Sequence, residues 1–122
     1  MDVLSPYLSA LAFIYLCICL WVVFLRRTLK VGIGDGGHRT LKRAIRVHAN
    51  FAENVPLALL LLLAAAPRVP EQTLHILALS LVVARLFHVA GLGRRPGTSL
   101  GRFWGAGLTW AVMGSAALLP WV

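Results

Sequence analysis

A long apolar run dominates the start of this sequence: from Val3 to Leu25, only Ser5, Pro6 and Ser9 interrupt it. A helix of about 20 apolar residues is long enough to cross the hydrocarbon core of a membrane. Of the 122 residues, 59% are hydrophobic and 13% are charged, whereas soluble domains have about 45–50% and about 25%. A soluble domain of this size could not bury so much apolar surface. The sequence therefore predicts an integral membrane protein and excludes a soluble enzyme, a disordered tail and a disulfide-stapled secreted module.

Helix-breaking residues divide the chain into further apolar runs. They are Gly32, Gly34, Gly36, Gly37, Pro67, Pro70, Gly91 and Gly93. We predict helices at about residues 3–25, 40–66, 71–92 and 100–119, which form one all-α, four-helix membrane domain over residues 1–122. The first is expected to be an uncleaved transmembrane helix that stops at Arg26, because Asp2 stands where a signal peptide carries basic residues.

The basic residues are distributed unevenly and predict an orientation. The first and third connections, with their flanks, hold eleven of the twelve: Arg26, Arg27, Lys30, Arg39, Lys42, Arg43, Arg46, Arg85, Arg94, Arg95 and Arg102. The second connection holds only Arg68. Since basic residues collect on the cytoplasmic side of membrane proteins, we expect this end to face the cytoplasm and both termini to face outward.

The two cysteines, Cys17 and Cys19, both lie in the first apolar run. Two helical steps place them about 200° apart, so they cannot bridge each other. No metal or redox motif surrounds them, and we expect ordinary side chains facing lipid or core.

Polar residues within the second expected helix form one stripe. Arg46, Asn50 and Glu53 are spaced i, i+4 and i+7, which places them within about 60° of arc. His48 lies roughly opposite Arg46. A carboxylate inside a membrane must be paired or carry its proton, and the cations available to Glu53 are Arg46 and Arg85. Charged residues inside spans are candidates for a functional site.

Two more helices bring polar groups to the same end of the bundle. Arg85 and His88 share a face of the third helix, and Arg102 begins the fourth. Arginines clustered at a cleft would bind the carboxylates of an anionic ligand, and Glu53 would accept a bond from its ammonium or amide group. An arginine beside a thiol lowers the thiol pKa and favours the thiolate. This pattern suits a peptide-like thiol used in glutathione conjugation or glutathione-dependent reduction.

The stretch from Arg46 to Pro56 resembles the signature of the MAPEG family, the membrane-associated proteins of eicosanoid and glutathione metabolism. The family pattern is Arg, Asn four residues on, Glu three further and Pro three further still, here Arg46, Asn50, Glu53 and Pro56. Arg26 with Arg27, and Arg85 followed by His88, also resemble family positions. The resemblance covers nearly the whole chain and is closest to the small bacterial branch of the family, which indicates the inner membrane.

The resemblance implies a homotrimer with glutathione as co-substrate, bound between adjacent subunits on the cytoplasmic side. It implies that glutathione is held by Arg26, Arg46, His48, Asn50, Glu53, Arg85 and His88. Arg102 would be the catalytic residue that stabilises the thiolate. The segment from Leu100 to Trp104 would line the mouth of the site and accept a hydrophobic co-substrate for conjugation or reduction.

This chain departs from the eicosanoid enzymes at three positions. Those enzymes often have tyrosines where Asn54, His88 and Leu92 stand, so affinity for glutathione could be weaker here, or the thiol different.

Other functions stay open at this point. The polar cluster could form a non-catalytic scaffold, in which the arginines only set topology and Asn50 and Glu53 join helices. A haem or quinone carrier would use His48 and His88. A small multidrug transporter fits only the length and the number of spans. Glu53 lies among arginines, which makes it a poor site for a cationic drug.

Overall fold

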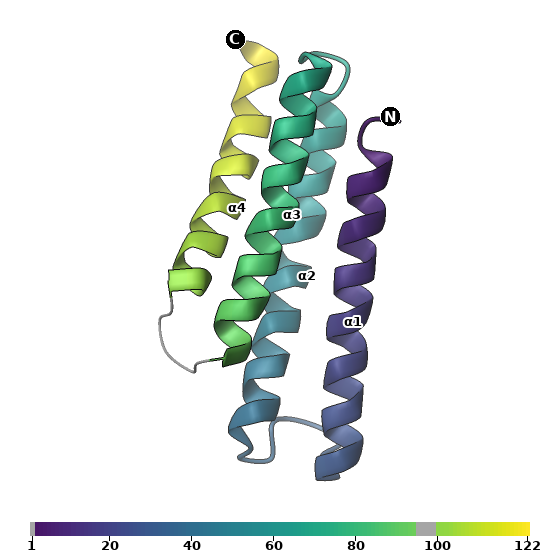
Figure 1. The fold of residues 1–122 in the computed structure, drawn as a ribbon, viewed down its shortest axis with the longest axis vertical. Helices are drawn as coiled ribbons and strands as arrows, with labels where there is room; N and C mark the ends of the chain where they lie inside the picture. Colours follow the sequence, from purple (N-terminus) through teal and green to yellow (C-terminus); the bar gives the residue numbers. More distant parts are fainter. Residues whose placement is uncertain (1, 95–99) are drawn as a thin grey trace.

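A computed structural model of the chain describes residues 2–94 and 100–122. The secondary structure of these residues is helical: α1 (Ser5–Leu29), α2 (Arg39–Ala65), α3 (Glu71–Arg94), α4 (Leu100–Leu118) and a short 3-10 turn, η1 (Leu119–Trp121). The four long helices lie side by side along one axis, with α1 and α4 flanking the central α2 and α3 (Figure 1). The all-α, four-helix architecture expected from the sequence is confirmed.

Three of the helices are long and apolar enough to cross a membrane. These are α1, α2 and the part of α3 from Glu71 to Gly91. The sequence predicted four spans, but α4 does not reach the same hydropathy among the described residues. Its 19 residues include Arg102 and several glycines and tryptophans, which lower its mean hydropathy. It nevertheless lies along α3 at the edge of the bundle (Figure 1).

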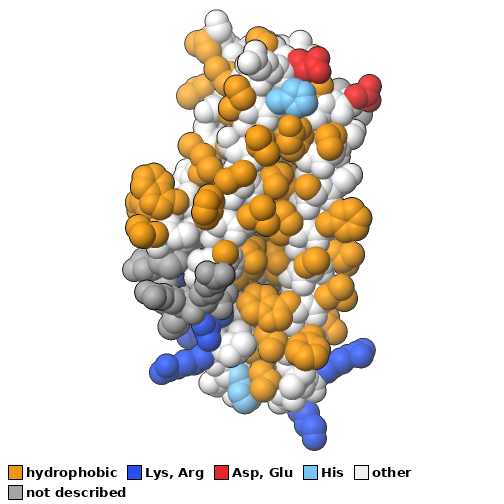
Figure 2. Space-filling model, in the orientation of Figure 1, with side chains coloured by type: hydrophobic (Ala, Val, Ile, Leu, Met, Phe, Trp, Pro, Cys, Tyr) orange, Lys and Arg blue, Asp and Glu red, His pale blue; other side chains and the backbone are white. Residues whose placement is uncertain are grey.

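Charge separates the two ends of the bundle. Both termini lie at one end, and the loop between α1 and α2 lies at the other (Figure 1). In the view of Figure 2, Lys and Arg side chains gather at the loop end, whereas Asp and Glu side chains gather at the end with the termini. Of the basic residues counted above, Arg95 falls outside the described residues. The arrangement of termini matches the expected topology, while the side that faces the cytoplasm stays a prediction.

The ends of the helices differ from the expected ones by a few residues. α1 continues one turn beyond Arg26 and ends at Leu29, and Lys30 follows with a left-handed φ of 56°. Arginine is a good helix former, and positive charge is favourable at a helix C-terminus, so Arg26 and Arg27 extend the helix rather than end it. α2 runs through Pro56 without a break. α4 ends at Leu118, close to the expected end at residue 119, and η1 follows it.

The core is built around α2. Its buried residues recur every three or four positions: Leu41, Ala44, Val47, Phe51, Val55, Ala58, Leu62 and Ala65. In α1, by contrast, the buried residues Leu11 and Ile18 stand seven positions apart, as expected of a helix that touches its neighbours along a narrow seam. Large apolar side chains such as Phe13 and Phe24 are 68% and 65% exposed on the outside of the bundle. Cys17 and Cys19 are free, as expected.

Glycines bring α4 unusually close to α3. A Cβ atom placed on Gly105 would lie 2.7 Å from the carbonyl oxygen of Ala84 and 2.7 Å from the backbone nitrogen of His88. A Cβ on Gly101 would lie 2.9 Å from the carbonyl oxygen of Phe87. Small residues four positions apart allow such close packing between membrane helices. α3 and α4 therefore form a tightly packed pair.

Candidate functional site

Charged side chains of α2 face away from the core. Arg46 and Glu53 are exposed, and Asn50, one turn from each, is half-buried. On the opposite side of the helix, Val47 is 0% and Phe51 4% exposed. The stripe predicted from the spacing of these residues is therefore an outer face of the bundle. Because hydrocarbon does not solvate charges, this face needs a polar cover in a membrane.

Arg85 lies inside the bundle and connects three helices. Its exposure is 0%. Its Nη2 donates a 2.8 Å hydrogen bond to Oδ1 of Asn50 on α2, and its Nη1 donates a 3.5 Å bond to Oγ1 of Thr109 on α4. The guanidinium carbon also lies 5.3 Å from the ring centroid of Phe51. Arg85 thus positions the side-chain amide of Asn50 from behind the polar face, and its burial favours an indirect role toward any ligand.

Glu53 is not paired in the way that the sequence suggested. The expected cations were Arg46 and Arg85, but Arg85 turns inward to Asn50 and Thr109. Within residues 2–94 and 100–122, the ion pair found joins His75 to Glu71 and does not involve Glu53. Within one chain the structure therefore pairs Glu53 with neither arginine, and the expectation that this carboxylate is either paired or protonated stays a prediction. The carboxylate of Glu53 instead stays exposed on the outer face of α2.

Asn54 links α2 to α4. Its Oδ1 accepts a 3.1 Å hydrogen bond from Nε1 of Trp110, and its Nδ2 donates a 2.9 Å bond to the carbonyl oxygen of Asn50. From the sequence, Asn54 was seen only as a departure from a family tyrosine. The spacing of Asn50 and Asn54 indicated a shared helix face, but the partner on α4 depends on how the helices pack.

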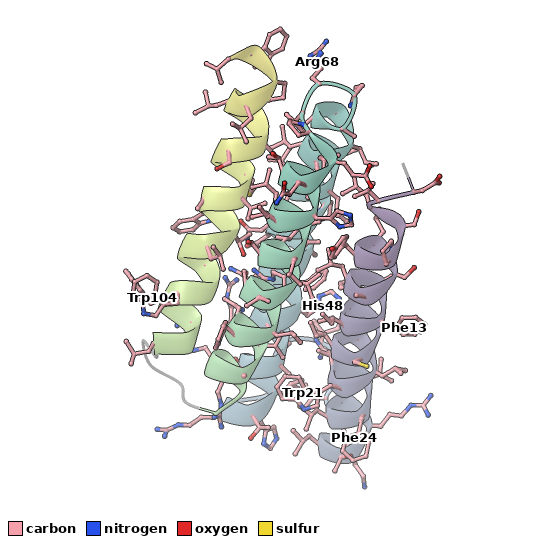
Figure 3. The ribbon with its side chains drawn as sticks, turned by 45° about the horizontal axis from the view of Figure 1, so that its top comes forward. Phe13, Trp21, Phe24, His48, Arg68 and Trp104 are labelled. Carbon is pink, nitrogen blue, oxygen red and sulfur yellow. The ribbon has the colours of Figure 1, made fainter. Side chains whose placement is uncertain are left out.

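His48 contacts α1 rather than the polar face. Its Nε2 lies 3.1 Å from the hydroxyl of Tyr15, and the two ring centroids are 5.2 Å apart. Tyr15 also stacks on Phe51 at 5.3 Å. Figure 3 shows His48 on the side of the bundle next to α1. Sequence reasoning missed Tyr15, whose hydroxyl in an otherwise apolar run was the available signal.

His88 is turned toward a different helix. It is 1% exposed, its backbone and Cβ abut Gly105 of α4, and its Nδ1 has no hydrogen-bond partner among the described residues. His48 and His88 face α1 and α4 respectively. The geometry therefore gives no support to a haem or quinone held by both histidines.

Arg26 stabilises the loop that follows α1. Its Nη1 lies 2.9 Å from the carbonyl oxygen of Gly34 and 3.4 Å from those of Val31 and Gly32, and it donates hydrogen bonds to them. In the single chain it is therefore occupied by its own loop. The role that the resemblance gives it, in a neighbouring subunit's site, stays a prediction.

Arg102 is half-buried in the first turn of α4, close to an apolar hollow. The hollow has a volume of about 370 Å³ and is lined by Phe87, Leu100, Gly101, Trp104 and Leu108. Trp104 is 64% exposed and projects outward from α4 (Figure 3). The segment that was expected to accept a hydrophobic co-substrate thus borders a hollow on the lipid side of α3 and α4.

The chain is similar in sequence to known membrane proteins. A family model described as "MAPEG family" matches residues 4–121. The inner membrane protein YecN of Escherichia coli strain K12 is 39% identical over 75 residues, which is 61% of this chain and 57% of YecN. YecN of Escherichia coli O6:H1 has the same identity and coverage. The match thus spans little more than half the length of these relatives. No solved structure matches the chain.

Proposed function

This chain belongs to the MAPEG family, and from that premise we propose that it binds glutathione on the outer polar face of α2 and presents the thiol to lipophilic substrates. In this proposal the protein is a homotrimer, and a second copy covers the bound glutathione. The proposal draws on the link of the family to glutathione and eicosanoid metabolism.

The observation that carries the proposal is the outward exposure of Arg46 and Glu53 on a membrane helix. Charges on a spanning helix are costly unless protein, ligand or water solvates them. Their own chain leaves both side chains exposed. A zwitterionic ligand enclosed by a neighbouring copy supplies an anion for Arg46 and a cation for Glu53 at once.

Each polar group of this face has a complementary group on glutathione. Arg46 pairs with a carboxylate through two parallel hydrogen bonds. Glu53 receives the ammonium group of the γ-glutamyl residue. Because Oδ1 of Asn50 accepts the bond from Arg85, its Nδ2 is left to donate outward to a ligand carbonyl or carboxylate. Arg85 acts in this scheme as the residue that orients Asn50.

The remaining residues of the predicted site take supporting places. His48, bonded to Tyr15, lies on the other side of α2 and acts indirectly by fixing α2 against α1. His88 supports the site from the interior of the bundle, three residues along α3 from Arg85. Arg26 contacts the ligand of an adjacent subunit when the loop that follows α1 is docked against that subunit.

In this proposal Arg102 activates the thiol of glutathione. A positive charge beside the sulfur stabilises the thiolate, the reactive form. In conjugation, the thiolate sulfur forms a bond to an electrophilic carbon while the leaving group departs with its electron pair. The apolar hollow beside Trp104 is placed to hold a lipophilic electrophile near this group. Holding the two reactants together provides the rate gain of proximity.

We place the protein in an inner membrane, with the basic end in the cytoplasm, where glutathione is available. The positive-inside rule and the similarity to an inner membrane protein support this orientation. Reporter fusions test it: fusions at either terminus should report the outer side, and an insertion after Ile33 the cytoplasmic side. The opposite pattern would exclude a cytoplasmic site.

Equilibrium binding of glutathione to the detergent-purified protein tests the proposal. Wild-type protein should bind saturably, and both Arg46→Ala and Glu53→Gln should lose binding. Arg27→Ala, which removes an exposed arginine at the end of α1, is the matched control and should bind as the wild type does. No binding by folded wild-type protein at millimolar glutathione would refute the proposal.

A non-catalytic scaffold is the second candidate, and one observation favours it. Arg85 fastens α2, α3 and α4 through hydrogen bonds to Asn50 and Thr109. A scaffold predicts that Glu53→Gln lowers thermal stability and that glutathione stabilises neither protein. Stabilisation of the wild type alone by glutathione would exclude this candidate.

A further inference from the structure

Hydrogen bonds from both α3 and α4 dock this helix pair onto α2. The two helices are locked together at Gly101 and Gly105, where backbone atoms of α3 leave no room for a side chain. One bond joins Arg85 of α3 to Asn50, and the other joins Trp110 of α4 to Asn54, one turn further along α2. Each helix of the pair therefore contributes one hydrogen bond to the position of the pair on α2.

The two docking bonds belong to one hydrogen-bond network. Trp110 donates to Asn54, and Asn54 donates to the carbonyl oxygen of Asn50. The side-chain oxygen of Asn50 accepts from Arg85, which also donates to Thr109, the neighbour of Trp110 on α4. This network thus begins and ends on adjacent residues of α4 and passes through α2 and α3.

We propose that Asn54 and Trp110 are positioning residues, which fix Arg102 of α4 relative to the ligand-holding face of α2. This inference rests on the function proposed above and deepens it. Arg102 and the hollow beside it lie on the α3–α4 pair, whereas Arg46, Asn50 and Glu53 lie on α2. The thiol and the charge that stabilises it therefore sit on opposite sides of the α2–α4 contact.

A simpler role for Asn54 would be to satisfy the indole N–H of Trp110, which is 61% exposed. That role predicts an effect on stability alone. A positioning role predicts in addition a lower kcat with an unchanged affinity for glutathione. Displacements of about 1 Å at a reacting centre can reduce rates by up to a hundredfold, whereas the groups that hold glutathione stay on α2.

The experiment compares full-length wild type with Asn54→Leu, Trp110→Phe and the double variant in detergent micelles. Trp121→Phe, at the far end of the bundle, is the matched control. Indole ¹H–¹⁵N resonances report the Asn54–Trp110 bond without any ligand. Steady-state kinetics with glutathione and 1-chloro-2,4-dinitrobenzene separate KM from kcat.

We expect Asn54→Leu to move the Trp110 indole resonance upfield. Each single variant should reduce kcat about tenfold, well within the range known for misplaced groups, and leave KM for glutathione within about twofold. The double variant should be no worse than Asn54→Leu, since both single variants remove the bond between Asn54 and Trp110. Trp121→Phe should match the wild type.

Three results would overturn the inference: an unmoved indole resonance in Asn54→Leu, an unchanged kcat in both single variants, or losses that multiply in the double variant. Wild-type protein that neither binds nor turns over glutathione would overturn the proposed function itself. That failure is visible before any variant is made, so the two are distinguishable.

Discussion

Replacement of Gly105 by alanine tests the close packing of α3 and α4. A Cβ atom there would lie 2.7 Å from the carbonyl oxygen of Ala84, 2.7 Å from the nitrogen of His88 and 2.8 Å from its Cβ. An ordinary contact needs at least 3.4 Å, so the helices would have to separate by about 0.7 Å. Backbone atoms cannot rotate away as a flexible side chain can.

The change in the free energy of unfolding caused by Gly105→Ala follows from two opposing effects. Insertion of an extra methyl group into a well-packed contact costs about 1–3 kcal/mol. Alanine in place of glycine within a helix gains about 1 kcal/mol. A Cβ atom on Gly107, two residues further along α4, would have nothing within 4 Å, so Gly107→Ala gains the same propensity without the clash. The free energy of unfolding should therefore be about 1–3 kcal/mol lower for Gly105→Ala than for Gly107→Ala.

Unfolding by sodium dodecyl sulfate in mixed micelles, followed by far-ultraviolet circular dichroism, measures this difference. Gly105→Ala should be less stable than the wild type or equal to it, and Gly107→Ala should be at least as stable as the wild type. Equal stability of the two variants would show that α3 and α4 are not in backbone contact at Gly105, and the reasoning about Arg102 would lose its basis.

Three further predictions concern single side chains. Arg102→Leu should abolish turnover, because the charge that holds the thiolate is lost, and calorimetry should show little change in glutathione affinity; full activity would remove Arg102 from this role. Arg85→Met should lower the free energy of unfolding by about 1–3 kcal/mol, because Oδ1 of Asn50 and Oγ1 of Thr109 lose their donor, and it should weaken glutathione binding about tenfold because Asn50 is no longer oriented. Unaltered affinity would contradict that role. Tyr15→Phe should cost about 1 kcal/mol in denaturant titrations by removing the hydroxyl bond to His48, and an unshifted titration would argue against the bond.

The fold was largely predictable because its main signals are local. Apolar runs interrupted by glycine and proline define helices in any context, and the four expected helices are the four observed. The end of α1 was misplaced because Arg26 and Arg27 were interpreted as a stop at the membrane surface. Helix propensity and the favourable charge at a C-terminus carry the helix on to Leu29.

The candidate site was predictable only on α2, where one helix carries the whole pattern. Arg46, Asn50 and Glu53 share a face whatever surrounds them. Contacts between helices were not predictable, because they depend on rotation and depth. Arg85 was considered as a partner of Glu53, but it donates to Asn50 and Thr109 instead. Trp110 gave no sign in the sequence of its bond to α2. The four-residue spacing of Gly101 and Gly105 is a signal of close helix packing that was overlooked in the sequence, and the structure shows that it serves the contact between α3 and α4.

Native mass spectrometry of the protein released from micelles with glutathione present tests the central claim, that a second copy covers a ligand on the outer face of α2. The account predicts trimers that carry glutathione, monomers without it, and loss of the ligand in Glu53→Gln. Glutathione retained on monomers, or trimers that never carry it, would contradict the account.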